Sequence, residues 1–210
     1  MRIPASLRGA GRNVRSIALA RPSDKPGLRR QLRAVRGALP VDQRDAGSKA
    51  IARLGLSAIG TTPPRTISAY LAIGDEIDPD RLLMALHLAG HRLCLPVMVG
   101  KDRPLTFRAY APGDALAVVQ WGIREPKPER PEVLPDILLI PLLAADCCGQ
   151  RLGYGGGYYD RTLLYLRALK TVTAIGLAFD AQVIDAVPHL DYDQRLDQLL
   201  TPSGLISCRS

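Results

Sequence analysis

The sequence predicts an α/β protein, a single domain in which helices flank a central, largely parallel sheet. Apolar runs of strand length alternate with segments whose apolar residues have helical spacing, which is typical of strand–helix–strand crossovers. The 210 residues are 47% hydrophobic, enough for one sizeable core but not for two full domains. No apolar stretch approaches the roughly 20 residues that span a membrane. We therefore expect a cytoplasmic monomer that does not contact membranes.

Positive charge is concentrated near the N-terminus. Residues 1–53 hold 13 Lys and Arg against three acidic residues, within a net charge of +8. We divide the chain into a basic, flexible leader of residues 1–24, an α/β domain of residues 25–203 and a tail of residues 204–210. The composition of the leader fits an organellar targeting peptide, a disordered start or an overextended start, and the sequence does not choose between them.

The first predicted elements are two helices. Leu28, Leu32 and Val35 mark one face of a helix over residues 25–36, with basic residues around the rest of it. A second helix follows Asp42.

A strand–loop–helix unit comes next. Residues 66–72 are rich in β-formers and predict a strand, which leads into Gly74-Asp75-Glu76. Asp78 and Pro79 suit the N-cap and first position of a helix that ends near Gly90.

The second half of the chain predicts further strands that alternate with helical segments. Such alternation implies a parallel sheet with an open crossover, Rossmann-like topology. The expected strands are residues 92–97, 105–110, 137–140, 172–178 and 199–201, with a proline-rich loop over residues 126–135.

Residues 149–161, Gly-Gln-Arg-Leu-Gly-Tyr-Gly-Gly-Gly-Tyr-Tyr-Asp-Arg, say most about function. The apolar run 137–140 predicts a buried strand that feeds this loop, and the apolar positions after Asp160 have helical spacing. Four glycines within residues 153–157 allow backbone amides to converge, and two arginines add positive charge at the edges. The pattern matches neither a Walker loop nor a dinucleotide fingerprint. It favours a polyphosphate-binding loop, with a tight glycine turn as the alternative.

Three separated segments resemble the 5-formyltetrahydrofolate cyclo-ligase family. The resemblance extends from about Lys25 to Thr201. It implies conversion of 5-formyltetrahydrofolate to 5,10-methenyltetrahydrofolate through a phosphorylated formyl intermediate, using ATP and Mg²⁺ and releasing ADP and phosphate. The segments are Lys25-Pro-Gly-Leu-Arg29, Tyr70 to Ile77 and Arg151 to Asp160, supported by Trp121 to Pro126 and Asp193 to Asp197.

The resemblance also implies roles for individual residues. Lys25, Arg151 and Tyr158 are implied in catalysis, and Asp160 and Asp193 match the family's magnesium carboxylates. The implied ATP contacts are Lys25, Arg29, Arg151, Leu152, Gly153, Tyr154, Gly155, Gly156, Gly157, Tyr158 and Tyr159. The implied folate contacts are Leu71, Glu76, Tyr154 and Tyr158.

Other interpretations stay open. By themselves, Asp193 would fit an acidic surface loop and Glu76 an ordinary residue before a helix cap. A kinase of another small heterocycle is one alternative function, because the family usually has a Phe where Ala145 stands. A basic nucleic-acid-binding protein is another, but no Phe, Tyr or Trp precedes Tyr70 to provide a stacking platform. We therefore expect a reduced folate, and no nucleic acid, as the partner.

Overall fold

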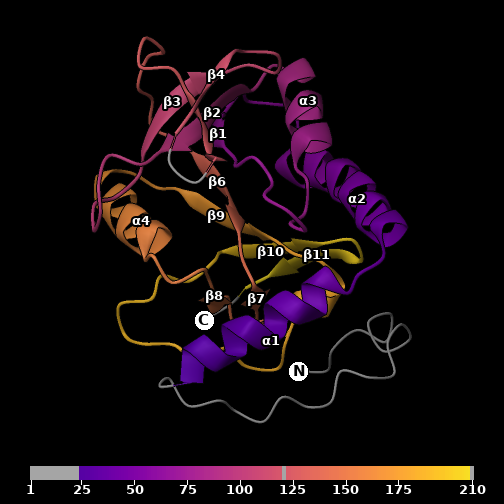
Figure 1. The fold of residues 1–210 in the computed structure, drawn as a ribbon. Helices are drawn as coiled ribbons and strands as arrows, with labels where there is room; N and C mark the ends of the chain where they lie inside the picture. Colours follow the sequence, from indigo (N-terminus) through magenta and orange to yellow (C-terminus); the bar gives the residue numbers. More distant parts are fainter. Residues whose placement is uncertain (1–23, 120–121, 209–210) are drawn as a thin grey trace.

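The strands form one central sheet and two small two-stranded sheets (Figure 1). This computed structural model describes residues 24–119 and 122–208. Within these residues the strands are β1 (Thr66–Ser68), β2 (Arg92–Val97), β3 (Thr106–Tyr110), β4 (Leu116–Val118), β5 (Arg124–Pro126), β6 (Ile137–Pro141), β7 (Ala144–Ala145), β8 (Arg151–Leu152), β9 (Thr173–Leu177), β10 (Gln198–Thr201) and β11 (Gly204–Ser207). The leader predicted for residues 1–24 lies, except for Asp24, outside the described residues.

The central sheet has the order β11–β10–β9–β6–β1–β2–β3. The five strands from β10 to β2 are parallel, and each edge strand is antiparallel to its neighbour. The chain starts at β1, builds outward through β2 and β3, and then returns to build the other side from β6. The order therefore reverses between β1 and β6, the place where open α/β sheets form a ligand crevice beyond the carboxyl ends of the strands.

Helices cover both faces of this sheet. They are α1 (Lys25–Gly37), α2 (Val41–Ile59), α3 (Asp80–Leu88) and α4 (Tyr158–Leu169), followed by a short 3-10 turn, η4 (Asp180–Gln182). Helices α2 and α3 lie together on one side of the sheet and α4 on the other (Figure 1). The fold class predicted from the sequence is confirmed.

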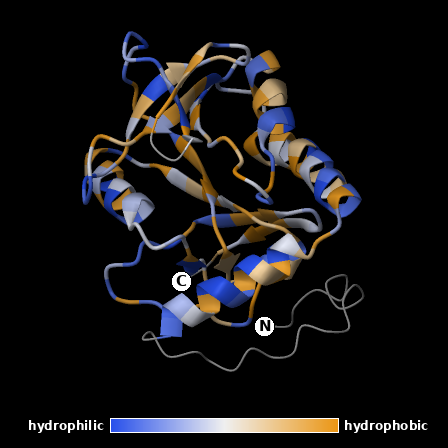
Figure 2. Ribbon diagram, in the orientation of Figure 1, coloured by the Kyte–Doolittle hydropathy of each residue, from blue (hydrophilic) through white to orange (hydrophobic). Residues whose placement is uncertain are grey.

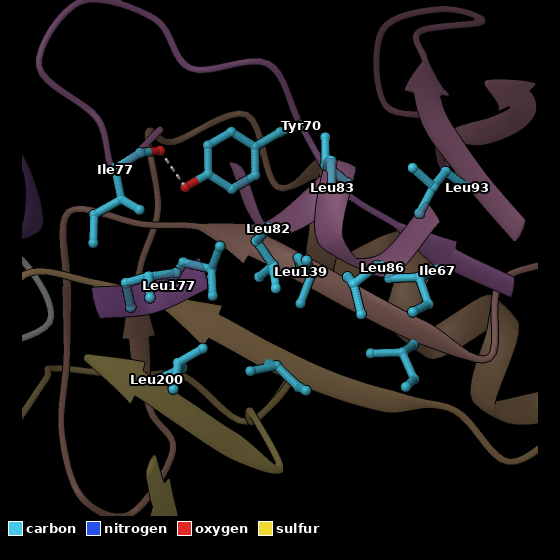
Figure 3. Packing of buried hydrophobic residues seen from close by; sticks show 14 of the residues in the cluster. Ile67, Tyr70, Ile77, Leu82, Leu83, Leu86, Leu93, Leu139, Leu177 and Leu200 are labelled. Atoms are coloured by element: carbon cyan, nitrogen blue, oxygen red, sulfur yellow. Dashed lines mark hydrogen bonds between the residues drawn. The ribbon is translucent and has the colours of Figure 1, made fainter. Parts of the chain in front are cut away.

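Strand β6 divides the core between the two faces. Side chains alternate along a strand, so Ile137 and Leu139 pack with α2 and α3, while Leu138 and Ile140 pack with α4. Figure 3 shows the first of these clusters. All four residues are buried, as expected for a parallel strand covered on both faces.

Helix α1 packs apart from these two cores. Its Leu28 and Leu32 belong to a third cluster with Leu152 of β8 and Val187, and Figure 2 shows the alternation of apolar and polar residues along the helix. Pro26 suits the first turn, where the missing N–H costs no hydrogen bond. The position of α1 brings its basic residues next to the segment that follows β8.

The structure corrects four expectations. The strand predicted for residues 66–72 ends at Ser68, because the chain leaves the sheet and curls back until the Tyr70 hydroxyl donates to the Ile77 carbonyl at 2.9 Å (Figure 3). The run 137–140 does not feed the glycine loop directly, because the antiparallel pair β7 and β8 intervenes. The pair β4 and β5 was not predicted, and residues 204–207, assigned to a tail, form edge strand β11. Among the described residues, no helix is long and apolar enough to cross a membrane.

Candidate active site

Two adjacent cavities lie at the crevice where the strand order reverses. The glycine-loop cavity, of about 350 Å³, is lined by residues 151–160. The Glu76 cavity, of about 750 Å³, is lined by residues 70–76. The two cavities share a wall formed by Pro96, Met98, Ile123, Pro141, Tyr154 and Tyr158. A group bound in one cavity therefore lies next to a group bound in the other.

The site residues expected from the sequence all line one or both cavities. Tyr154 and Tyr158 line both. Those that line the glycine-loop cavity are Lys25, Arg29, Arg151, Leu152, Gly153, Tyr154, Gly155, Gly156, Gly157, Tyr158, Tyr159, Asp160 and Asp193. Those that line the Glu76 cavity are Leu71, Glu76, Tyr154 and Tyr158.

The residues of the loop between β8 and α4 line the first cavity. Gly155 has φ of +104° and Gly157, the N-cap of α4, has φ of +65°, values that residues with a Cβ rarely adopt. Among the described residues, no hydrogen bond uses the amides of residues 153–157. They stand at the N-terminus of a helix, where the dipole favours an anion. The geometry suits a phosphate group.

Three cations surround this loop. Lys25 and Arg29 come from the first turns of α1, and Nε of Arg29 donates to the Gly153 carbonyl at 3.0 Å. Arg151 comes from β8, and only 5% of its side chain is exposed. Burial lowers the pKa of Arg151, while Asp160 and Asp193 act to raise it. An arginine remains charged after such a shift, so all three side chains can neutralise phosphate oxygens.

Two carboxylates face the same cavity. Oδ2 of Asp193 lies 2.5 Å from Nζ of Lys25, and Oδ1 of Asp160 lies 2.7 Å from Nη2 of Arg151. The backbone amides of Leu190 and Gln194 donate to these same two oxygens. Among the described residues, no hydrogen bond uses the other oxygen of either carboxylate. Each of the two carboxylates thus retains one oxygen without a hydrogen bond from the described residues. Such oxygens suit Mg²⁺, a cation that takes one or two carboxylates along with phosphate and water.

The tyrosines at the start of α4 differ in their surroundings. The guanidinium of Arg161 lies 5.2 Å from the ring centre of Tyr158, so one face of that ring is covered by a cation. Tyr159 lines the glycine-loop cavity and packs against the α4 core. Burial raises the pKa of Tyr159, so it stays protonated.

Glu76 is held in the second cavity by two donors. The backbone amide of Ile73 donates to Oε2 at 3.0 Å, and the Tyr154 hydroxyl donates to Oε1. Only 8% of the Glu76 side chain is exposed. The carboxylate is therefore nearly removed from bulk water and keeps acceptor capacity on the cavity side.

Sequence reasoning missed Arg36, which lies at the centre of the contacts around Glu76. Its Nε and Nη2 donate to Oδ1 of Asp75 at 3.0 and 2.6 Å, and its Nη1 donates to the Tyr154 hydroxyl at 2.6 Å. Burial acts to lower the pKa of Arg36, but the hydrogen bonds to Asp75 and Tyr154 outweigh it and raise the pKa. The available signal was the spacing of Arg36, which lies four residues beyond Leu32 and eight beyond Leu28 and so continues the buried stripe of α1.

Glu125 was also missed as a lining residue, and Ala145 proves remote. Glu125 on β5 is 6% exposed, lines the glycine-loop cavity and accepts a hydrogen bond from the Met98 amide at 3.0 Å. Ala145 is fully buried and lines neither cavity. Asp146, next to it, fixes the backbone by accepting from the amides of Cys148 and Val187. The unusual Ala145 does not alter the wall of either cavity.

Comparisons with known proteins point to one family. Residues 21–202 match the family model described as the 5-formyltetrahydrofolate cyclo-ligase family. The chain is 36% identical over 177 residues to the 5-formyltetrahydrofolate cyclo-ligase of Escherichia coli (strain K12), covering 80% of this chain and 94% of that one. It is 34% identical over 200 residues to that of Mycolicibacterium smegmatis, covering 90% and 99%.

Solved structures show the same fold. The 5,10-methenyltetrahydrofolate synthetase of Mycoplasma pneumoniae matches with a TM-score of 0.69 and 25% identity, over 85% of this chain and 99% of that one. The 5,10-methenyltetrahydrofolate synthetase of Aquifex aeolicus matches with a TM-score of 0.73 and 27% identity, over 89% and 94%.

Proposed function

The chain belongs to the 5-formyltetrahydrofolate cyclo-ligase family, and from this premise we propose which cavity receives each substrate and what the residues do there. The protein has 5-formyltetrahydrofolate cyclo-ligase activity, also called 5,10-methenyltetrahydrofolate synthetase activity. Membership implies an ATP-dependent ligase that acts on a folate. The positions of ATP, Mg²⁺ and the folate are the proposal.

ATP binds in the glycine-loop cavity, with its phosphates on the loop. The amides of residues 153–157 that make no other hydrogen bond, together with Lys25, Arg29 and Arg151, supply donors and positive charge for the phosphate oxygens. The γ-phosphate then points toward the shared wall, since that is where the reaction with the second substrate takes place.

Asp160 and Asp193 would hold Mg²⁺ in the same cavity through the carboxylate oxygens that make no other hydrogen bond. When bound, it neutralises charge on the phosphoryl group that is transferred. Arg151 and Lys25 hold the two carboxylates in place through their other oxygens. The chain thus orients the ligand atoms before the cation arrives.

The folate binds in the Glu76 cavity with its pterin edge on the carboxylate. An aminopyrimidine edge offers two N–H donors, and Glu76 keeps acceptor capacity on both oxygens. Leu71 provides an apolar wall, and Tyr154 and Tyr158 lie between this cavity and the ATP site. This arrangement directs the formyl group to the shared wall.

The chemistry requires proximity and charge neutralisation. The formyl oxygen attacks the γ-phosphorus and ADP leaves. Nitrogen N10 of the folate then attacks the activated formyl carbon and loses its proton, and the C–O bond breaks to release phosphate. The products are the methenyl bridge, ADP and phosphate. The residues contribute by aligning the two substrates and stabilising the phosphoryl group, which accounts for most catalysis of phosphoryl transfer.

The observation that carries this proposal is the shared wall between a cationic glycine-loop cavity and a carboxylate cavity. Purified protein mixed with 5-formyltetrahydrofolate, ATP and Mg²⁺ is expected to form the methenyl chromophore and ADP in equal amounts, and to form neither when one component is omitted. ADP formation without the folate would favour a kinase of another heterocycle. The expected cytoplasmic location and monomeric state remain predictions, the latter for light scattering to check.

A further inference from the structure

One hydroxyl group joins the two cavities. Tyr154 belongs to the glycine loop and lines both cavities, whereas Glu76 and Arg36 line only the Glu76 cavity. The Tyr154 hydroxyl accepts a hydrogen bond from Nη1 of Arg36 at 2.6 Å and donates one to Oε1 of Glu76. A change in the position of the loop is therefore carried to the carboxylate on the other side of the shared wall.

The direction of these hydrogen bonds is determined by chemistry. A guanidinium donates and does not accept, so Arg36 must be the donor to Tyr154. Burial raises the pKa of Tyr154, and the neighbouring Glu76 raises it further. The phenol keeps its proton at neutral pH. Its O–H group therefore donates the hydrogen bond to the carboxylate. The order Arg36, Tyr154, Glu76 is thus the arrangement that satisfies all three groups.

Tyr154 also determines which acceptor sites of Glu76 stay open. An ionised carboxylate has about four acceptor sites, two on each oxygen. The Ile73 amide takes one on Oε2, and the Tyr154 hydroxyl takes one on Oε1. One site on each oxygen remains, which matches a ligand edge with two donors. Without the hydroxyl, the Ile73 amide would be the one hydrogen bond from the described residues to the carboxylate, and Oε1 would keep only the contact with Nη1 of Arg36 at 4.0 Å.

Helix α1 holds the loop in the position that allows this contact. Arg29 donates to the Gly153 carbonyl, and Arg36 contacts the adjacent Tyr154. The guanidinium groups of Arg33 and Arg36 also lie 5.5 and 5.7 Å from the centre of the Tyr154 ring. Arg36 is itself fixed by Asp75 from the segment that contains Glu76. The helix, the glycine loop and residues 70–76 thus meet at one guanidinium.

We infer that Tyr154 is a positioning residue that couples the binding of the two substrates, an inference that rests on the proposed function. Phosphates bound to the loop amides would add to the α1 contacts that hold the Tyr154 hydroxyl on Glu76, and would thereby strengthen folate binding. Thermodynamic reciprocity requires the folate to strengthen nucleotide binding by the same factor.

The test compares binding constants with and without the second ligand. Calorimetry measures the Kd of 5-formyltetrahydrofolate alone and in the presence of Mg²⁺ and a non-hydrolysable ATP analogue. We expect the analogue to lower the folate Kd of the wild type about fivefold or more, and that of Tyr154→Phe less than about twofold. The Phe variant keeps the ring and its contacts with Arg33 and Arg36. Tyr165→Phe, on the exposed side of α4, is the matched control and should retain the wild-type factor.

Each outcome decides the inference. The inference is overturned if the ATP analogue leaves the folate Kd of the wild type unchanged. It is also overturned if the analogue lowers the folate Kd of Tyr154→Phe by the same factor as that of the wild type. If thermal unfolding shows that Tyr154→Phe is not folded, Arg36→Lys interrupts the same chain of hydrogen bonds, because lysine lacks the planar fork. The proposed function fails separately, when the wild type forms no methenyl product. A wild type that forms product without coupling contradicts only this inference.

Discussion

Asp160 and Asp193 in one cavity and Glu76 in the other are held in different ways. In the glycine-loop cavity, Asp160 and Asp193 are each paired with a cation, Arg151 and Lys25. In the Glu76 cavity, the carboxylate is held by a neutral hydroxyl and a backbone amide, and its nearest cation, Arg36, lies 4.0 Å away and is bound to Asp75. In the first cavity these two carboxylates are paired with cations before any ligand arrives, whereas Glu125 accepts from the Met98 amide. The second keeps a nearly buried negative charge for a ligand that donates hydrogen bonds.

Under the proposed function, this difference explains how one crevice separates two ligands of different chemistry. A polyphosphate and its cation would exchange the ion pairs within the protein for ion pairs between protein and ligand. The new ion pairs then offset the free-energy cost of removing the ligand charges from water. A neutral pterin edge instead completes the hydrogen bonding of one carboxylate. Substitutions should therefore affect one ligand or the other according to the cavity in which they lie.

The largest effect is expected from removing a charge at the proposed metal position. Asp160→Asn should lower turnover about 100-fold or more and raise the Mg²⁺ concentration needed for half-maximal activity, because an amide oxygen is a poorer ligand for a hard cation. Steady-state rates measured over a range of Mg²⁺ concentrations give both the turnover and the half-maximal Mg²⁺ concentration. The control is Asp45→Asn. The Asp45 side chain is exposed on the surface of α2, and this variant should behave as the wild type. A normal magnesium requirement in Asp160→Asn would remove the cation from this position.

The next effect concerns the cations of the same cavity. Lys25→Ala should raise the Kd of an ATP analogue about tenfold or more while changing the folate Kd less, since a hydrogen bond to a charged group contributes about 1.5–3 kcal/mol. Calorimetry with each ligand alone separates the two. Lys49→Ala, from an exposed ion pair on α2, serves as the matched control. An equal increase in the Kd of both ligands would contradict the assignment of one ligand to each cavity.

A substitution in the Glu76 cavity should have the opposite selectivity and weaken folate binding more than nucleotide binding. Glu76→Gln should raise the folate Kd about tenfold and leave that of the ATP analogue nearly unchanged, because one oxygen becomes a donor and no longer accepts from the pterin edge. The control is Glu132→Gln, whose side chain is 63% exposed and lines neither cavity. If nucleotide binding weakens as much as folate binding, Glu76 supports the whole crevice instead of one ligand.

The smallest effect is on stability and concerns the Arg36–Asp75 pair. Burial acts to raise the pKa of Asp75, but the hydrogen bonds from Arg36 outweigh it and lower the pKa overall. A carboxyl with a lowered folded-state pKa stabilises the protein above its unfolded pKa, and this contribution is lost as pH falls through the folded-state value. The difference in unfolding free energy between wild type and Asp75→Asn should be constant from about pH 5 to pH 8 and shrink below about pH 4. Urea unfolding at several pH values measures it, and a difference that grows on acidification would contradict the assignment.

The local elements and the glycine loop could be predicted from the sequence. Strands β2 and β6 were predicted because continuous apolar runs of β-formers are a local signal. The loop of residues 153–157 was predicted because four glycines before a helical pattern determine backbone geometry over a few residues. The residues of the loop all line the glycine-loop cavity, as consecutive residues at the start of one helix are expected to do, and Tyr154 also lines the Glu76 cavity.

Contacts across large sequence separations could not be predicted in this way. Arg36, Glu76 and Tyr154 are 40 and 78 residues apart, and no periodicity within any one element indicates that they meet. The same holds for the end of β1, where the hydrogen bond from the Tyr70 hydroxyl to the Ile77 carbonyl accompanies a loop that lines the Glu76 cavity in place of the predicted strand. Sequence alone therefore predicted the glycine loop and strands β2, β3, β6, β9 and β10, because these follow from local backbone and side-chain preferences. Only the tertiary structure decided that the glycine-loop cavity and the Glu76 cavity share one wall, because the packing of α1, β1 and α4 around the crevice sets those distances.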